Sequence, residues 1–163
     1  LFRDKERDRC SAFSVDANEA LLGAGANFGI QSFGFNSTLD LTHAVFSLPD
    51  GWGVVFNQNL SALGIFYANP NGTGNVRKDP LEFKINASGI TAESDFYVAN
   101  EGGYHYTAHI AGFTNATTLG ADGSLINSAW FADGPVSIPE PEILTLFGLG
   151  LLALAGLRRL LFA

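Results

Sequence analysis

Apolar and polar positions alternate along this chain in short stretches that are separated by turn residues. The clearest stretch is 81–86, where the sequence reads LEFKIN. Residues that alternate with a period of two lie on opposite faces of a strand, so the apolar side chains share one face and the polar side chains share the other. This stretch therefore predicts a strand that is buried on one face only.

Turn residues recur between these stretches at short intervals. Gly, Asp, Asn and Pro supply the positive or fixed φ angles that tight turns require. Such clusters occur at 49–51, 69–72, 88–89, 101–103, 122–123 and 133–135. Many short strands with regular turn signals are typical of all-β domains. We predict a mainly β fold, an antiparallel β-sandwich over residues 24–134, followed by a single C-terminal hydrophobic helix.

The same parity argument selects the residues of the expected core. Ten positions fall on the inward face of a predicted strand: Leu41, Val54, Phe56, Ile65, Leu81, Phe83, Ile85, Val98, Tyr106 and Ile110. One region breaks the rule, because Phe28 and Ile30 have one parity and Phe33 and Phe35 have the other. A regular strand with one buried face cannot bury all four of these side chains. We expect either a β-bulge near Gln31 or a strand that is buried on both faces.

The first 23 residues have a different texture. Acidic and basic residues alternate over positions 3–9 without an apolar face. This pattern indicates a charged leader that is disordered or forms a short helix, and we assign it no function. The chain contains no Met, so we expect that Leu1 is not the start of translation and that any export signal preceded it.

A Pro-rich linker at 135–142 leads into an apolar tail at 143–163. Residues 143–157 carry no charge, and Arg158 and Arg159 follow them. As a helix, 143–157 would span roughly 20 Å, which approaches the ~30 Å hydrocarbon core of a membrane. Apolar side chains lie on all sides of that helix, which favours a membrane anchor over an amphipathic surface helix. A helix buried in a soluble core is the alternative.

The charges around the tail predict its orientation. Basic residues beside an apolar span stay on the cytoplasmic side, and the flanking cations Arg158 and Arg159 follow the span. Glu140 and Glu142 lie on its other flank. We therefore expect the arginines inside the cell and the β domain outside the cytoplasmic membrane.

Composition narrows the class of protein. The chain has 163 residues and a net charge of −7, with 16 acidic residues against 9 Lys and Arg. This length suits one domain, and the shortage of clustered cations argues against a nucleic-acid partner. The single cysteine, Cys10, cannot form an internal disulfide.

The order of features at the C-terminal end resembles a PEP-CTERM sorting signal. Pro139, Glu140 and Pro141 precede the apolar segment, and Arg158 and Arg159 follow it. Such signals occur on exported proteins of Gram-negative bacteria that make exopolysaccharide, and they resemble in plan the LPXTG tag of Gram-positive surface proteins. The resemblance implies recognition and cleavage by exosortase, a membrane protease or transpeptidase. It also implies a transient membrane anchor and an association with biofilm. The stretches 100–110 and 129–133 are similar to parts of the β-rich bodies of some such proteins.

Candidate catalytic and metal-binding residues in the body do not form a convincing set. His105 and His109 share one face of a predicted strand but would lie about 13 Å apart, too far for one metal ion. His43 has the parity of a core or edge histidine. Glu93 and Asp95 would lie about 7 Å apart on a strand, a separation compatible with glycoside hydrolysis or calcium binding. We predict no catalytic residue, no metal site and no cofactor.

Three functions follow, in order of preference. The first is an exported, non-catalytic protein of the cell surface or extracellular matrix. The second is a carbohydrate-binding or adhesion module on the same fold, in which exposed aromatic residues stack on sugar rings. Its candidates are Tyr67, Tyr97, Tyr104 and Trp130, for which core packing is the alternative. The third is a secreted hydrolase.

Overall fold

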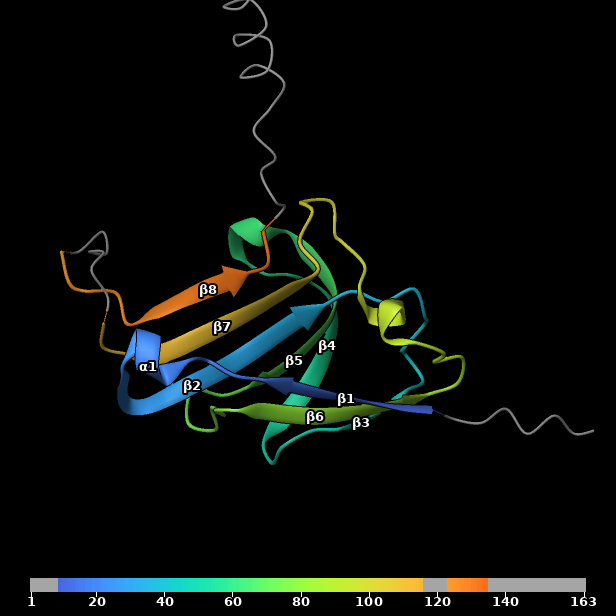
Figure 1. Ribbon diagram of the computed structural model, residues 1–163, viewed down its shortest axis with the longest axis horizontal. Helices are drawn as coiled ribbons and strands as arrows, with labels where there is room; N and C mark the ends of the chain where they lie inside the picture. The colour runs from blue at the N-terminus through green and yellow to red at the C-terminus, as the bar shows by residue number, and fades with distance from the viewer. Residues whose placement is uncertain (1–8, 116–122, 135–163) are drawn as a thin grey trace, which may run out of the picture. The chain divides into compact units, whose positions relative to one another are not determined.

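A computed structural model describes residues 9–115 and 123–134, whose strands form two antiparallel sheets (Figure 1). The smaller sheet has three strands in the order β1-β6-β3. Its strands are β1 (Arg9–Val15), β6 (Leu81–Ala87) and β3 (Val45–Ser47).

The larger sheet has five strands in the order β4-β5-β2-β7-β8. These strands are β4 (Trp52–Asn59), β5 (Ile65–Gly72), β2 (Ala24–Phe35), β7 (Tyr106–Phe113) and β8 (Ser128–Ala132). The helices among the described residues are short: α1 (Glu19–Leu22), η1 (Ser61–Leu63) and η2 (Glu93–Phe96). The prediction of a mainly β, antiparallel body is confirmed.

Strand β6 has the predicted alternation. Leu81 and Ile85 are fully buried and Phe83 is 3% exposed, whereas the polar residues between them face solvent. The inward face of β6 therefore closes one side of the core, as the sequence pattern predicts.

Strand β1 corrects the prediction for the first 23 residues. Residues Arg9–Val15 pair with the whole of β6, from Arg9 opposite Ala87 to Val15 opposite Leu81. The sequence signal is weak because only Phe13 and Val15 are large and apolar in this strand, and serines surround them. Over residues 9–23, the expected short helix is present as the single turn α1.

Phe13 joins the two sheets. Its ring stacks on Phe83 of the neighbouring strand at 4.7 Å between centroids and also lies 5.4 Å from Phe35 of the larger sheet. Phe96 meets the same ring edge-on at 5.3 Å. Aromatic pairs at these separations stabilise a core beyond the area that they bury. The facing sides of the two sheets consequently share one hydrophobic cluster.

Both expectations for the irregular strand β2 are confirmed. Its register against β7 shifts between Ile30 and Ser32, which marks the predicted bulge. The shift brings Ile30, Phe33 and Phe35 into the core. Ser32 is also buried, and the side-chain amide of Asn69 donates to its hydroxyl at 2.6 Å. The other face of the strand is thus buried as well, against Asn69 at Ser32 and against Leu60 and Phe66 at Gly34.

Strand β5 departs from the predicted parity. Ile65 is 59% exposed, and Phe66 is fully buried in its place. The chain before this strand is irregular, because Leu63 lies in η1 and Gly64 has a φ of 91°. The left-handed turn at this glycine resets the alternation, so β5 begins at Ile65. Val54, Phe56, Val98 and Tyr106, which were also expected in the core, are half-buried.

The predicted membrane helix at 143–163 lies outside the described residues. Within 9–115 and 123–134, no helix has the length and apolar character needed to cross a membrane.

Replacing Phe83 by Ala should destabilise the fold strongly. The change removes a buried ring that contacts Phe13, Phe33 and Phe35. We expect a loss of about 3–5 kcal/mol in the free energy of unfolding, measured by urea denaturation. Glu82→Ala on the exposed face of β6 is the control and should change it by less than about 0.5 kcal/mol. A loss below about 1 kcal/mol for Phe83→Ala would contradict the assigned core.

Candidate functional site

The residues of the predicted sorting site lie outside the described part of the chain. They are Pro139, Glu140, Pro141, Arg158 and Arg159. The described body ends just before this segment, so its last strand and the side chains around it define where the tail begins.

Asp133 fixes the end of β8 to the start of β7. One oxygen of its carboxylate accepts hydrogen bonds from the backbone N–H groups of His105 at 3.0 Å and Tyr106 at 2.7 Å. The other oxygen lies 3.0 Å from Nδ1 of His105. Charge-assisted hydrogen bonds of this kind are stronger than neutral ones. The carboxylate therefore holds the chain in place shortly before the linker at 135–142.

The His105 ring is also held from its face. Tyr97 stacks on it with 3.8 Å between ring centroids and 5° between planes. The Tyr97 side chain is 58% exposed. Burial, and then the charge of Asp133, raise the pKa of the neighbouring Tyr106 hydroxyl, so this group stays protonated at neutral pH.

A second histidine site lies further along β7. Nε2 of His109 is 2.6 Å from the hydroxyl oxygen of Ser128, and its ring stacks on Trp130 at 4.9 Å. Burial, and then the positive charge of Arg77, lower the pKa of the His109 imidazole below its usual value of 6.5. A neutral imidazole beside a hydroxyl is the geometry of a general base with its nucleophile.

The parts of a hydrolytic triad are nevertheless divided between the two histidines. His105 has a carboxylate partner, and His109 has a hydroxyl partner. Residues four apart on a strand are separated by about 13 Å, so Asp133 cannot orient the His109 ring. Within the described residues, no group of three or more His, Cys, Asp and Glu side chains is placed to hold a metal ion.

Glu93 and Asp95 do not lie on a strand, contrary to the prediction, but in η2. The carboxylate of Asp95 accepts hydrogen bonds from the backbone N–H groups of Thr91 at 2.7 Å and Ala92 at 2.9 Å. The bond from Ala92, and then that from Thr91, lower the pKa of this carboxyl. Short polar side chains favour such local bonds, so Asp95 acts as a helix cap. His43 is exposed, so the structure places it at the surface and not in the core.

The aromatic candidates for sugar binding are mostly engaged in packing. Tyr67 is half-buried, and its hydroxyl accepts from the backbone N–H of Leu41 at 2.9 Å and donates to Asp40 at 3.1 Å. Tyr104 and Trp130 are also half-buried. Tyr97 is the exposed member of the four, and it belongs to the His105 stack.

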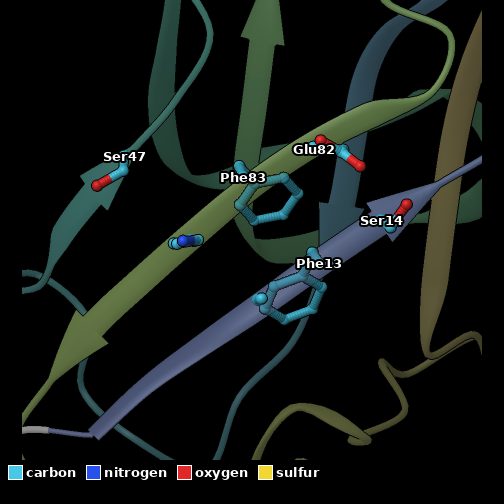
Figure 2. A pocket seen from close by; sticks show the side chains of 7 residues that line it. Phe13, Ser14, Ser47, Glu82 and Phe83 are labelled. Carbon is cyan, nitrogen blue, oxygen red and sulfur yellow. The ribbon is translucent and has the colours of Figure 1, made fainter.

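A pocket of about 570 Å³ lies over the smaller sheet (Figure 2). Its labelled lining consists of Phe13 and Ser14 from β1, Ser47 from β3, and Glu82 and Phe83 from β6. Phe13 and Phe83 also belong to the core, so the pocket ends against packed rings. The lining offers two hydroxyls, the carboxylate of Glu82 and the ammonium group of Lys84, but no histidine or cysteine.

Sequence reasoning missed the partners of both histidines. Ser128 and Asp133 lie 19 and 28 residues away from His109 and His105, and they come together through the pairing of β7 with β8. No local spacing marks such pairs. The pairing register, with His109 opposite Trp130, is the signal that would have found them.

Comparison with known protein families gives one match. Residues 137–159 match the PEP-CTERM protein-sorting motif. No curated protein and no solved structure matches the chain. The chain therefore carries the sorting signal of an exported protein that is handled at the membrane, and the signal implies an interaction with exosortase. The resemblance deduced from the sequence is confirmed.

The titration of His109 should make the fold less stable in mild acid. Its folded-state pKa is lowered, so the unfolded chain takes up a proton first as pH falls through about 6.5. Stability is therefore full above this value and falls until the folded-state pKa is passed. Urea midpoints at pH 7.5 and 5.5 measure the loss, and His109→Gln should reduce it. His43→Gln, at an exposed site, is the control. An NMR titration midpoint for His109 at or above 6.5 would contradict the assignment.

Proposed function

We propose that this protein is an exported, non-catalytic component of the cell surface or extracellular matrix, with a tail that exosortase reads and cleaves. The observation that carries the proposal is the match of residues 137–159 to the sorting motif, next to a β body with its own core. A sorting signal acts through a contiguous segment, so it needs no catalytic group in the body. In this proposal the protein associates with exopolysaccharide and biofilm.

The tail is proposed to act as a transient membrane anchor. Its apolar segment holds the chain in the cytoplasmic membrane, with Arg158 and Arg159 retained inside by the positive-inside rule. Pro139 and Pro141 lack backbone N–H groups and disfavour helix, which keeps the recognition segment extended outside the membrane. An extended segment suits the active site of a protease. Cleavage near it would release the body, as a GPI-type tail is removed from its protein.

The histidine sites support a body without hydrolytic activity. A serine hydrolase needs nucleophile, base and orienting carboxylate in one chain of hydrogen bonds. Here Ser128 faces His109, whereas Asp133 faces His105. The carboxylate of Asp95, a catalytic candidate in the sequence, accepts the hydrogen bonds that cap η2.

A carbohydrate-binding role is the second candidate. The exposed Tyr97 ring, which the His105 ring backs, favours it, because a flat, supported aromatic ring is a surface for a sugar. This candidate differs from the first in requiring Tyr97. Retention on immobilised polysaccharide that is lost in Tyr97→Ala would favour it.

Changing Pro139, Glu140 and Pro141 together to Ala should abolish processing. We expect the intact precursor to accumulate in membranes of a host that has exosortase, because the recognition segment is lost. Fractionation and the mass of the released body measure the outcome. Pro135→Ala, in the same linker but before the matched segment, is the control and should be processed normally. Unchanged processing of the triple variant would show that 143–157 is an ordinary anchor or a buried helix.

The purified protein should show no turnover on polysaccharide, ester and peptide substrates. The physical reason is the divided triad, because the carboxylate of Asp133 contacts His105 whereas His109 contacts Ser128. Chromogenic assays and mass spectrometry of the products measure this. Turnover that disappears in Ser128→Ala, or in Glu93→Gln, would instead place the protein among hydrolases.

A further inference from the structure

The free edges of the two sheets differ in how they are protected. The edge strands are β1 and β3 in the smaller sheet and β4 and β8 in the larger one. β3 has three residues and β8 has five. The free side of β1 borders η2, because Ser11, Ala12 and Phe13 line a pocket together with Glu93 and Phe96. Short edges and edges covered by a loop resist pairing with another chain.

Strand β4 has neither form of protection. It has eight residues, WGVVFNQN, without a charged residue or a proline. Charged side chains and prolines are the residues that natural edge strands use to prevent pairing. The chain as a whole has a net charge of −7, so a neutral edge of this length is exceptional within it.

The free side of β4 is open to solvent. None of its residues is buried, Val55 is 44% exposed, and a side chain added at Gly53 would meet nothing within 4 Å. Among the strands that the structure describes, β5 is its one hydrogen-bonded neighbour. Every second residue of an edge strand points its N–H and C=O away from its neighbour, so β4 presents backbone donors and acceptors on its free side. The N–H of Trp52 is an exception, because it donates to the carbonyl oxygen of Pro49 at 3.1 Å.

The core also reaches this edge. Trp52, Val54 and Phe56 pack against the core cluster but remain half-buried. Covering them would add apolar burial to any pairing at β4. The regular run ends after Phe56, because Asn57 has a φ of 53°.

We propose that β4 is a self-association edge, at which the run Trp52–Phe56 pairs antiparallel with the same run of a second copy. The inference does not rest on the proposed function. A two-fold axis at Val54 makes the interface self-complementary and places Trp52 opposite Phe56 of the second copy. On the outer face of the sheet, the same axis places Gly53 of one copy opposite Val55 of the second copy. Aromatic and β-branched pairs of this kind stabilise antiparallel sheets.

The pairing gives a weak dimer. Five residues from each copy cover less area than the ~800 Å² per partner of a standard stable interface. The negative charge of the two copies adds repulsion that salt screens. The dimer therefore forms at high local concentration, as on a crowded surface, and strengthens with salt.

Opposite charges at positions 53 and 55 test both the edge and the register. One variant combines Gly53→Lys with Val55→Lys, and the other combines Gly53→Glu with Val55→Glu. Gly53 has no positive φ and faces open space, and Val55 is exposed, so the single chain tolerates both pairs. In a dimer each introduced charge faces a like charge. We expect the dimer dissociation constant to rise at least about tenfold for either variant alone.

Mixing the two variants should restore association, because each lysine then faces a glutamate of the other copy. Sedimentation velocity of the full chain in non-ionic detergent, from micromolar to millimolar concentration, gives the constants. Circular dichroism and urea midpoints check folding, and Gly53→Ser with Val55→Thr is a neutral second pair that should still dimerise. Val45→Lys on β3, at a valine that is 65% exposed, is the matched control and should leave the constant unchanged.

Four results would overturn the proposal. The wild-type chain could stay monomeric up to about 1 mM, or the charged variants could associate like wild type. The mixture could associate no better than its components. Finally, Phe131→Lys could abolish association while the variants at Gly53 and Val55 leave it unchanged. The first three results would contradict pairing at β4 or its proposed register, and the last would place the contact at β8. None of them bears on the sorting motif, which the processing experiment tests separately.

Discussion

The stacking of Phe13 on Phe83 is the contact on which the rest of the body depends. The two rings lie parallel at 4.7 Å, and Phe13 also contacts Phe33, Phe35 and Phe96. One strand near the N-terminal end thus links β6, the larger sheet and the segment before β7. The histidine sites on β7 depend on this packing indirectly, because β7 is positioned by its pairing with β2, which carries Phe33 and Phe35.

Alternation of apolar and polar residues predicts a strand correctly where one face is buried and the other is exposed to solvent. Strand β6 satisfies that condition, and its pattern could be deduced from the sequence without error. The pattern is weak in β1, where apolar residues are few, and it misleads at β5, where the backbone turns at Gly64 before the strand begins. In β2 the conflict between two parities was itself informative, since it marked the register shift near Ile30.

The two candidate sites differ in the kind of information that specifies them. The sorting motif is contiguous, so the sequence alone predicts it, and the match at 137–159 agrees. The contacts of His105 with Asp133 and of His109 with Ser128 depend on the register of β7 against β8. A change of one residue in that register would move these side chains to the other face of the sheet. Composition and spacing therefore cannot reveal them.

The same distinction separates what the sorting motif requires from what the body provides. The matched motif at 137–159 is a contiguous segment that follows the body, so it requires of the body only that it fold and end at a defined residue. Asp133 meets the second need, because its carboxylate holds two groups of His105 and the N–H of Tyr106 at the start of β7, shortly before the linker. The edges of the sheets are not part of either requirement. An uncharged edge such as β4 is costly for a protein that must stay dispersed, and it suits one whose place is among other copies of itself.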